Sequence, residues 1–217
     1  MKRASKISGL ILIGILLLIL FTLRLTGLEP PELEGEELRA HHDINRPGLW
    51  LKGELVTTPV TDWSFVNKPG AARGTNTIMV ETRTPYFIPH SVRTAALARN
   101  GQLYIPSRQG CPIALHGDAC EKYIHEYNRM DVAFPKNKFW TSNVGRDPRV
   151  RLKIDGKLYD VTLVLVTDRA EATAIFGRDP ESREIGPGGQ EHIVGYTHIY
   201  HVFQRNVPEV EWAETWK

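Results

Sequence analysis

The clearest pattern in the chain is one long hydrophobic run near the N-terminus, followed by short alternating segments. From Ile7 to Leu23 the sequence contains no charged residue. A helix rises about 1.5 Å per residue, so this run lies near the lower limit for crossing roughly 30 Å of hydrocarbon. The pattern predicts one transmembrane helix over residues 7–24.

The charges on either side of this run predict its orientation. Lys2, Arg3 and Lys6 precede it, whereas glutamates crowd residues 29–37. Basic residues concentrate on the cytoplasmic side, so residues 1–6 are expected inside and the rest of the chain outside, periplasmic on the inner membrane if the protein is bacterial. A cleaved signal peptide is the alternative, although residues 21–27 lack a good small-x-small cleavage site.

The segment that follows differs in composition from the rest of the chain. Residues 25–48 are rich in Glu and Pro and show no sustained apolar periodicity, which predicts a stalk. No segment divides residues 49–217 into comparable halves. They are therefore expected to form one domain.

Short β-rich segments separated by Pro, Gly and Asn dominate from Trp50 onward. Asn100-Gly101 and Asp155-Gly156 each lie between two such segments and predict hairpins. The expected strands cover residues 50–56, 77–83, 91–98, 102–106, 150–154, 157–167 and 192–205.

Helices are expected to be few and short. Asp168 with Glu171 forms a capping box ahead of a segment that Gly177 closes, and Asp118 with Glu121 repeats this arrangement. A third short helix is predicted over residues 138–144, and residues 179–190 are expected to be a loop. The fold class is mainly β, an antiparallel sheet or small barrel of about six or seven strands with short helices.

The net charge restricts the classes of binding partner that can be expected, and the two cysteines bear on the redox state of the compartment. The formal net charge is +2, from 27 basic and 25 acidic residues, without a basic block interleaved with aromatics. This argues against a nucleic-acid partner. Cys111 and Cys120 lie in the outward-facing domain, where oxidising conditions permit a disulfide, and two separate buried thiols are the alternative.

One segment has the composition of a phosphate-binding turn. After Tyr104 the chain presents a hydroxyl, a guanidinium and a flexible glycine together, and such a turn can bind a phosphate. A solvated loop is the alternative. The candidate phosphate ligands are Arg93, Ser107, Arg108, Gln109 and Gly110.

The histidines do not predict a metal site. His41-His42-Asp43 lies in the expected stalk. His198 and His201 are three residues apart on a predicted strand and so point to opposite faces. Nucleophile-elbow, Walker, Rossmann and His-Glu-x-x-His motifs are absent from the sequence.

Several motifs follow one another in a known order. They are residues 101–107, the turn at 108–110, the helix at 139–144 with Trp140 and Asn143, the strand entrance at 147–152 and the hairpin at 156–159. Together these motifs, within residues 76–175, resemble the flavin-binding split β-barrels of the pyridoxamine-phosphate oxidase type. The branch they resemble most is the deazaflavin-dependent nitroreductase family.

The resemblance implies a split β-barrel that binds FMN or a deazaflavin and transfers a hydride to an unknown small substrate. Arg93, Ser107 and Arg108 would hold the phosphate. Trp140 would border the flavin ring, and Asn143 would fix the helix or a ring carbonyl. A packing or surface role is the alternative for each of these residues.

The chain also departs from that family. Residues 111–138 intervene between the turn and the helix as an insert, which either covers the cofactor cleft or fills it. The first hypothesis is an extracytoplasmic flavin-dependent oxidoreductase, and the alternative is a non-catalytic, membrane-tethered binding module on the same barrel. A third hypothesis is haem binding through His116, His125 or His198. A homodimer is expected by analogy of fold alone.

Overall fold

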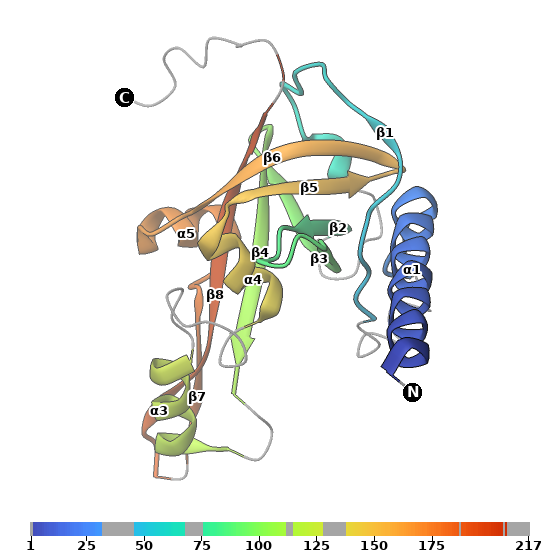
Figure 1. Cartoon of the computed structure of the whole chain (residues 1–217). Coiled ribbons are helices and arrows are strands. Elements are labelled where there is room, and N and C mark those ends of the chain that lie inside the picture. The colour runs from blue at the N-terminus through green and yellow to red at the C-terminus, as the bar shows by residue number, and fades with distance from the viewer. Residues whose placement is uncertain are drawn as a thin grey trace.

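The computed structural model describes residues 2–31, 46–67, 76–111, 115–127, 138–186, 188–205 and 207. Its first element, α1 (Lys2–Thr26), is a single helix beside the β domain (Figure 1). Residues Gly9–Thr26 are long and apolar enough to cross a membrane, and none of them is buried against the protein. The predicted apolar helix is confirmed, and an anchor and a signal sequence both remain compatible with it.

Eight strands form one sheet that closes into a barrel. Strands β6, β5, β2, β3, β4 and β8 pair in that order, and β8 also pairs with β6, so six antiparallel strands form a closed ring. Strands β1 and β7 are additional edge strands. The bounds are β1 (Glu54–Leu55), β2 (Asn76–Thr82), β3 (His90–Arg99), β4 (Gln102–Gly110), β5 (Arg149–Ile154), β6 (Lys157–Leu165), β7 (Glu181–Ile185) and β8 (Glu191–Gln204).

Four short helices accompany the barrel: η1 (Ser64–Val66), α3 (Gly117–Tyr127), α4 (Phe139–Arg146) and α5 (Arg169–Phe176). The capping box of α5 is confirmed, because the Asp168 side chain accepts a hydrogen bond from the Glu171 amide and Gly177 closes the helix in the left-handed conformation. Helix α4 continues past Gly145, where the sequence predicted its end.

Both predicted hairpins are present. Asn100 and Gly101 have φ values of 51° and 75°, and Asp155 and Gly156 have values of 50° and 76°. Two consecutive positive φ angles define the type I′ turn, whose twist matches that of paired strands. The first turn joins β3 to β4 and the second joins β5 to β6.

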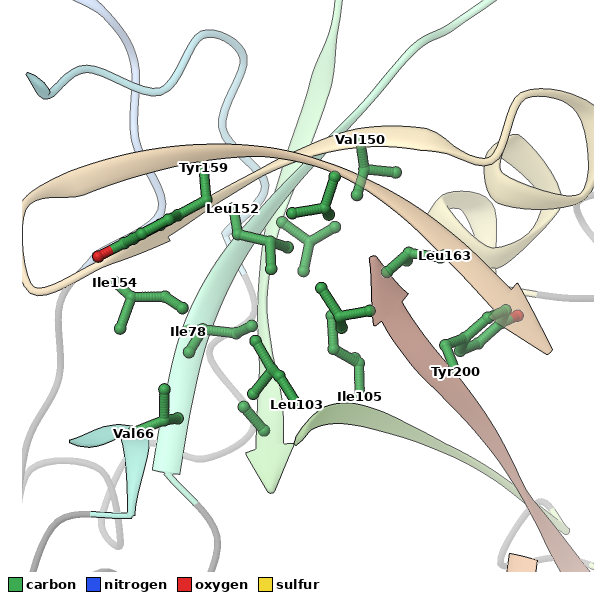
Figure 2. Packing of buried hydrophobic residues seen from close by; sticks show 14 of the residues in the cluster. Val66, Ile78, Leu103, Ile105, Val150, Leu152, Ile154, Tyr159, Leu163 and Tyr200 are labelled. Carbon is green, nitrogen blue, oxygen red and sulfur yellow. The ribbon is translucent and has the colours of Figure 1, made fainter. Parts of the chain in front are cut away.

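The interior of the barrel is a packed hydrophobic core. Alternate residues of the strands, among them Leu103, Ile105 and Leu152, are fully buried and point toward one another (Figure 2). Trp140 and Val144 of α4 join the same cluster. The barrel therefore holds side chains rather than a ligand.

The structure corrects three strand boundaries. In the predicted strand 50–56, only Glu54 and Leu55 pair, in parallel with β6. Residues 181–185, predicted as part of a loop, form the edge strand β7. Strand β4 continues to Gly110 instead of ending in a turn at Ser107, because the segment pairs with β8.

The expected stalk contacts the barrel at both of its described ends. The Leu28 amide bonds to the Trp50 carbonyl at 3.3 Å, and Gly48 pairs with Ser91 of β3. The Glu29 carboxylate lies 2.5 Å from Lys153 Nζ of β5. Residues 32–45 lie outside the described residues, so for them the stalk stays a prediction.

Beyond the barrel, three strand segments form an arm. We define the arm as residues 107–110 of β4, all of β7 and residues 191–198 of β8. These segments pair with one another, and α3 packs against β8 at the far end of the arm (Figure 1).

Candidate functional site

The residues proposed to hold a flavin phosphate lie on two sides of the barrel wall. Ser107 is buried and falls on the same face of β4 as Leu103 and Ile105, which line the core. Arg108 falls on the opposite, exposed face. On β3, Arg93 alternates with the core residue Val92 and so faces outward. The structure therefore does not bring Arg93 and Ser107 together.

The segment proposed as a phosphate-binding turn is a regular strand. Residues 107–110 pair one by one with residues 195–198 of β8. A close approach at Gly195 permits this pairing, since a Cβ there would lie 2.8 Å from the Gln109 carbonyl oxygen. Extended backbone directs successive amide groups to opposite sides, so this segment does not form a concave nest of N–H groups for an anion.

Positive charge nevertheless gathers near the start of α4. The pKa of Lys138 is lowered by desolvation of its ammonium group and by the nearby charge of Arg108. Burial also lowers the pKa of Arg93, whose guanidinium donates to the Pro31 carbonyl at 3.3 Å. Arg108 and Lys138 therefore form a region of positive charge at this end of α4.

Trp140 and Asn143 of α4 have structural contacts. The Trp140 ring is buried in the core, with its centroid 5.7 Å from that of Tyr200. Asn143 is buried, donates to Thr82 Oγ1 at 3.0 Å and accepts from Arg146 at 3.0 Å. These contacts fix α4 to the barrel and account for both side chains without a ligand.

A pocket of about 360 Å³ lies on the arm, beneath α3. Residues from four elements line it: Ile124 and His125 of α3, Leu165, Val166 and Thr167 at the end of β6, Glu181 of β7, and Ile193, Tyr196 and His198 of β8. A volume of this size lies within the range of small-molecule sites, about 300–1,000 Å³.

The wall of the pocket formed by α3 is fastened to the arm. Cys120 and Ile124, one helical turn apart, are both buried on the side of α3 that packs against β8. Cys120 forms a disulfide with Cys111, which follows β4 directly. The predicted disulfide is present, and it ties α3 back to the strand that precedes it.

The pocket lining combines aliphatic side chains with a few polar side chains. The rings of Tyr196 and His198 lie 5.1 Å apart, and His198 is buried. Burial, together with the negative charge of Glu181, raises the pKa of Tyr196. The Glu181 carboxylate lies 3.0 Å from Arg169 and 2.9 Å from Arg183, so its charge is already balanced.

The histidines named from the sequence separate as expected. His198 lines the pocket, whereas His201 stacks on Tyr104 on the other face of β8, with centroids 4.8 Å apart. His125 lines the same pocket as His198, and His116 is exposed just before α3. His41, His42 and Asp43 lie outside the described residues. Haem binding stays a prediction, and two of its three candidate ligands share one pocket.

Sequence reasoning did not identify this pocket. The sequence predicts a loop around Glu181 and the end of a strand at Leu165, Val166 and Thr167, and neither pattern indicates a pocket. One usable signal was present: Tyr196 and His198 are two residues apart on a strand and so share a face.

A scan against models of protein families finds no match to this chain, and a search of curated proteins finds no match either.

Proposed function

We propose that this chain is a membrane-tethered binding module that holds a small molecule in the pocket beneath α3. The observation that carries the proposal is the pocket itself, which combines an aliphatic lining with a few convergent polar groups. The packed barrel serves as a scaffold for the arm. The insert at residues 111–138 supplies one wall of the pocket through α3.

The lining favours a partly apolar, aromatic ligand without net charge. Ile124, Leu165 and Ile193 offer aliphatic contact, and the rings of Tyr196 and His198 offer aromatic faces. The Tyr196 hydroxyl and the His198 imidazole can hydrogen-bond to such a ligand. Because Glu181 is already paired with two arginines, the pocket does not call for a cationic group.

Ligand-observed NMR with an aromatic fragment library tests the binding module, using the full-length protein in nanodiscs. The wild-type protein and I185W, which changes an exposed residue of β7, are expected to bind the same fragments. I193W fills the pocket and is expected to abolish binding. T167W, at an exposed position of the lining, repeats the test without burying the new side chain. Equal binding to all four proteins, or to none, contradicts the proposal.

A second candidate function, an extracytoplasmic flavin- or deazaflavin-dependent oxidoreductase, is supported by the motif order and by the cations Arg108 and Lys138. Among the candidate residues Arg93, Ser107, Arg108, Gln109, Gly110, Trp140 and Asn143, Arg93 and Ser107 lie on opposite faces of the barrel wall, so we derive no hydride-transfer step from this set.

Absorbance and fluorescence spectra of the full-length protein test this second function, recorded before and after addition of FMN and of a deazaflavin. A stoichiometric bound chromophore that R108Q weakens would support it. R178Q, at an exposed arginine stacked on Phe176, is the matched control. A colourless protein that binds neither compound would contradict the oxidoreductase and leave the binding module as the proposed function.

The proposed location is the outer side of a cytoplasmic membrane, with α1 as the anchor. The basic residues before α1 and the Cys111–Cys120 disulfide both support it, since disulfides persist in oxidising compartments. Protease added to whole cells and to spheroplasts is expected to degrade the domain only in spheroplasts. A domain resistant in both would place it in the cytoplasm. The homodimer stays a prediction.

A further inference from the structure

Three side chains with metal-binding atoms meet where α3 packs against the arm. Asp118 and Glu121 come from α3, and His192 comes from β8. One ligand atom from each residue lies within 4.8 Å of the other two. This cluster lies outside the residues that line the pocket.

The distances in the cluster match ligands around a single ion. His192 Nδ1 lies 3.3 Å from Asp118 Oδ1 and 3.5 Å from Glu121 Oε2. In a tetrahedral zinc site, bonds of about 2.0–2.1 Å place neighbouring ligand atoms about 3.3 Å apart. Each carboxylate oxygen therefore lies at about the distance from Nδ1 expected for two ligands of one ion, and all three ligand atoms lie within 4.8 Å of one another.

The imidazole of His192 points into the cluster without a hydrogen bond. The residue is only 9% exposed, and among the described residues its buried Nδ1 has no hydrogen-bond partner. Leaving a buried polar atom unsatisfied is unfavourable, and such atoms are rare in folded proteins. A metal ion bound to Nδ1 would remove this cost.

The opposite edge of the imidazole is packed against Gly186. A Cβ atom at this position would lie 2.9 Å from His192 Cδ2 and 3.0 Å from Nε2. The ring is therefore held on its Nε2 side, and Nδ1 stays directed at the two carboxylates. On α3, Asp118 and Glu121 are three residues apart and so share a face of the helix.

We propose that Asp118, Glu121 and His192 bind a divalent transition-metal ion, with water completing its coordination. Two carboxylates and one imidazole are ligands that suit Zn²⁺ or Mn²⁺, and a nitrogen ligand disfavours Mg²⁺ and Ca²⁺. The ion joins α3 to β8, and the disulfide joins the same helix to the end of β4. The site does not depend on the proposed function, because it shares no residue with the pocket lining.

Calorimetric titration tests the site, using full-length protein freed of metal with a chelator. One Zn²⁺ per chain is expected to bind, and MgCl₂ and CaCl₂ are expected to give no comparable heat. The E121Q and H192Q variants are expected to bind Zn²⁺ at least about tenfold more weakly. E126Q changes another carboxylate of α3, outside the cluster, and is expected to bind like the wild type.

Three outcomes overturn the proposal. Wild-type protein that does not bind Zn²⁺ would show that His192 and the carboxylates form an ion pair only. Equal affinity in E121Q, H192Q and wild type would place any bound zinc elsewhere, and an H41Q/H42Q variant tests the histidine pair as that source. Tighter binding of Mg²⁺ or Ca²⁺ would contradict the metal class.

A second measurement guards against variants that do not fold. Co²⁺ bound to the wild-type protein is expected to show the intense visible absorption of a four-coordinate site, and one equivalent of Zn²⁺ is expected to displace it. Weak absorption typical of hexahydrated Co²⁺ would contradict the proposal without any substitution.

Discussion

Asn143 shows how one buried amide fixes a helix to the barrel. Its side chain donates to Thr82 Oγ1 of β2 and accepts from Arg146 within α4. N143A would leave the buried Thr82 hydroxyl without this donor, and we expect the free energy of unfolding to fall by about 1–3 kcal/mol. Urea unfolding of the full chain in detergent, followed by tryptophan fluorescence, measures the change.

S142A is the matched control for N143A. The Ser142 hydroxyl donates to the Lys138 carbonyl and, among the described residues, makes no hydrogen bond to a strand, so its loss is expected to cost less than about 0.5 kcal/mol. Equal destabilisation by the two substitutions would show that N143A acts only by changing the helix propensity of α4, and not through the lost hydrogen bond to Thr82.

Asp147 makes stability depend on pH in a defined direction. Its carboxylate accepts two hydrogen bonds of 2.8 Å from the Arg149 guanidinium, which lowers its pKa from 3.8 to about 2. Because the folded pKa lies below the unfolded one, the stabilisation is present above about pH 4 and is lost as the pH falls through about 2.

D147N is expected to lower the free energy of unfolding by about 1–2 kcal/mol at pH 7. The difference from the wild type should shrink between pH 4 and pH 2, where the wild-type carboxyl becomes protonated. Urea midpoints at several pH values measure it, with E54Q on the exposed edge strand β1 as the control. A difference independent of pH would contradict the role of the ionised carboxylate.

At the scale of elements, α3 is held to the arm by few connections, and the disulfide is one of them. The bond closes a loop with a sequence separation of 9 between Cys111 and Cys120. In the chain-entropy account a loop of this size contributes about 2–3 kcal/mol. A C111S/C120S variant is therefore expected to keep the barrel but to loosen α3.

Hydrogen exchange detected by mass spectrometry measures this loosening. The amides of α3 are expected to exchange faster in C111S/C120S, while those of α5, on the barrel side, keep the wild-type rate. Reduction of the wild-type protein should reproduce the change. Unchanged exchange in α3 would mean that packing of Cys120 and Ile124 against β8 suffices to hold the helix.

Elements with local signals were predictable from the sequence. The Asn100-Gly101 and Asp155-Gly156 turns and the Asp168 cap depend on neighbouring residues alone, and all three are present. Strand β7 and the extension of β4 were missed, because their structure comes from pairing with β8, which is distant in sequence. The parallel pairing of β1 with β6 likewise has no local signal.

The candidate sites were harder to predict than the fold for the same reason. Asp118 and Glu121 matched a capping box, and only the packing of α3 against β8 brings His192 to them. Ser107 and Arg93 looked like partners in sequence, but the alternation of side chains along β4 and β3 directs them to opposite sides. The segment predicted as a phosphate-binding turn is instead the end of β4, which pairs with β8.

At the scale of the whole molecule, hydrogen bonds and an ion pair connect α1 and the segment after it to the barrel. The Lys52 ammonium bonds to the Arg24 carbonyl near the end of α1, and the Leu28 and Leu49 backbones are hydrogen-bonded. Glu29 contacts both the Lys52 amide and the Lys153 ammonium. The chain that leaves α1 is therefore attached to the barrel before residue 32.

The ion pair between Glu29 and Lys153 gives the sharpest test of this connection. The Lys153 side chain is only 12% exposed, so E29Q removes the Glu29 negative charge from beside a largely buried ammonium. We expect E29Q to lower the free energy of unfolding of the full chain by about 1–3 kcal/mol, because a buried charge becomes more costly when a compensating charge is removed. Urea unfolding in detergent measures it.

The double variant E29Q/K153M tests whether Glu29 and Lys153 bind the segment after α1 to the barrel, or whether that segment is only a passive linker. Removing both charges leaves no buried ammonium at this position, so the double variant is expected to be more stable than E29Q alone. If the effects of E29Q and K153M are simply additive, the two side chains do not act on each other, and residues 27–31 only join α1 to the barrel. A coupling of about 1 kcal/mol or more would instead show that the segment after α1 is bound to β5 through this ion pair.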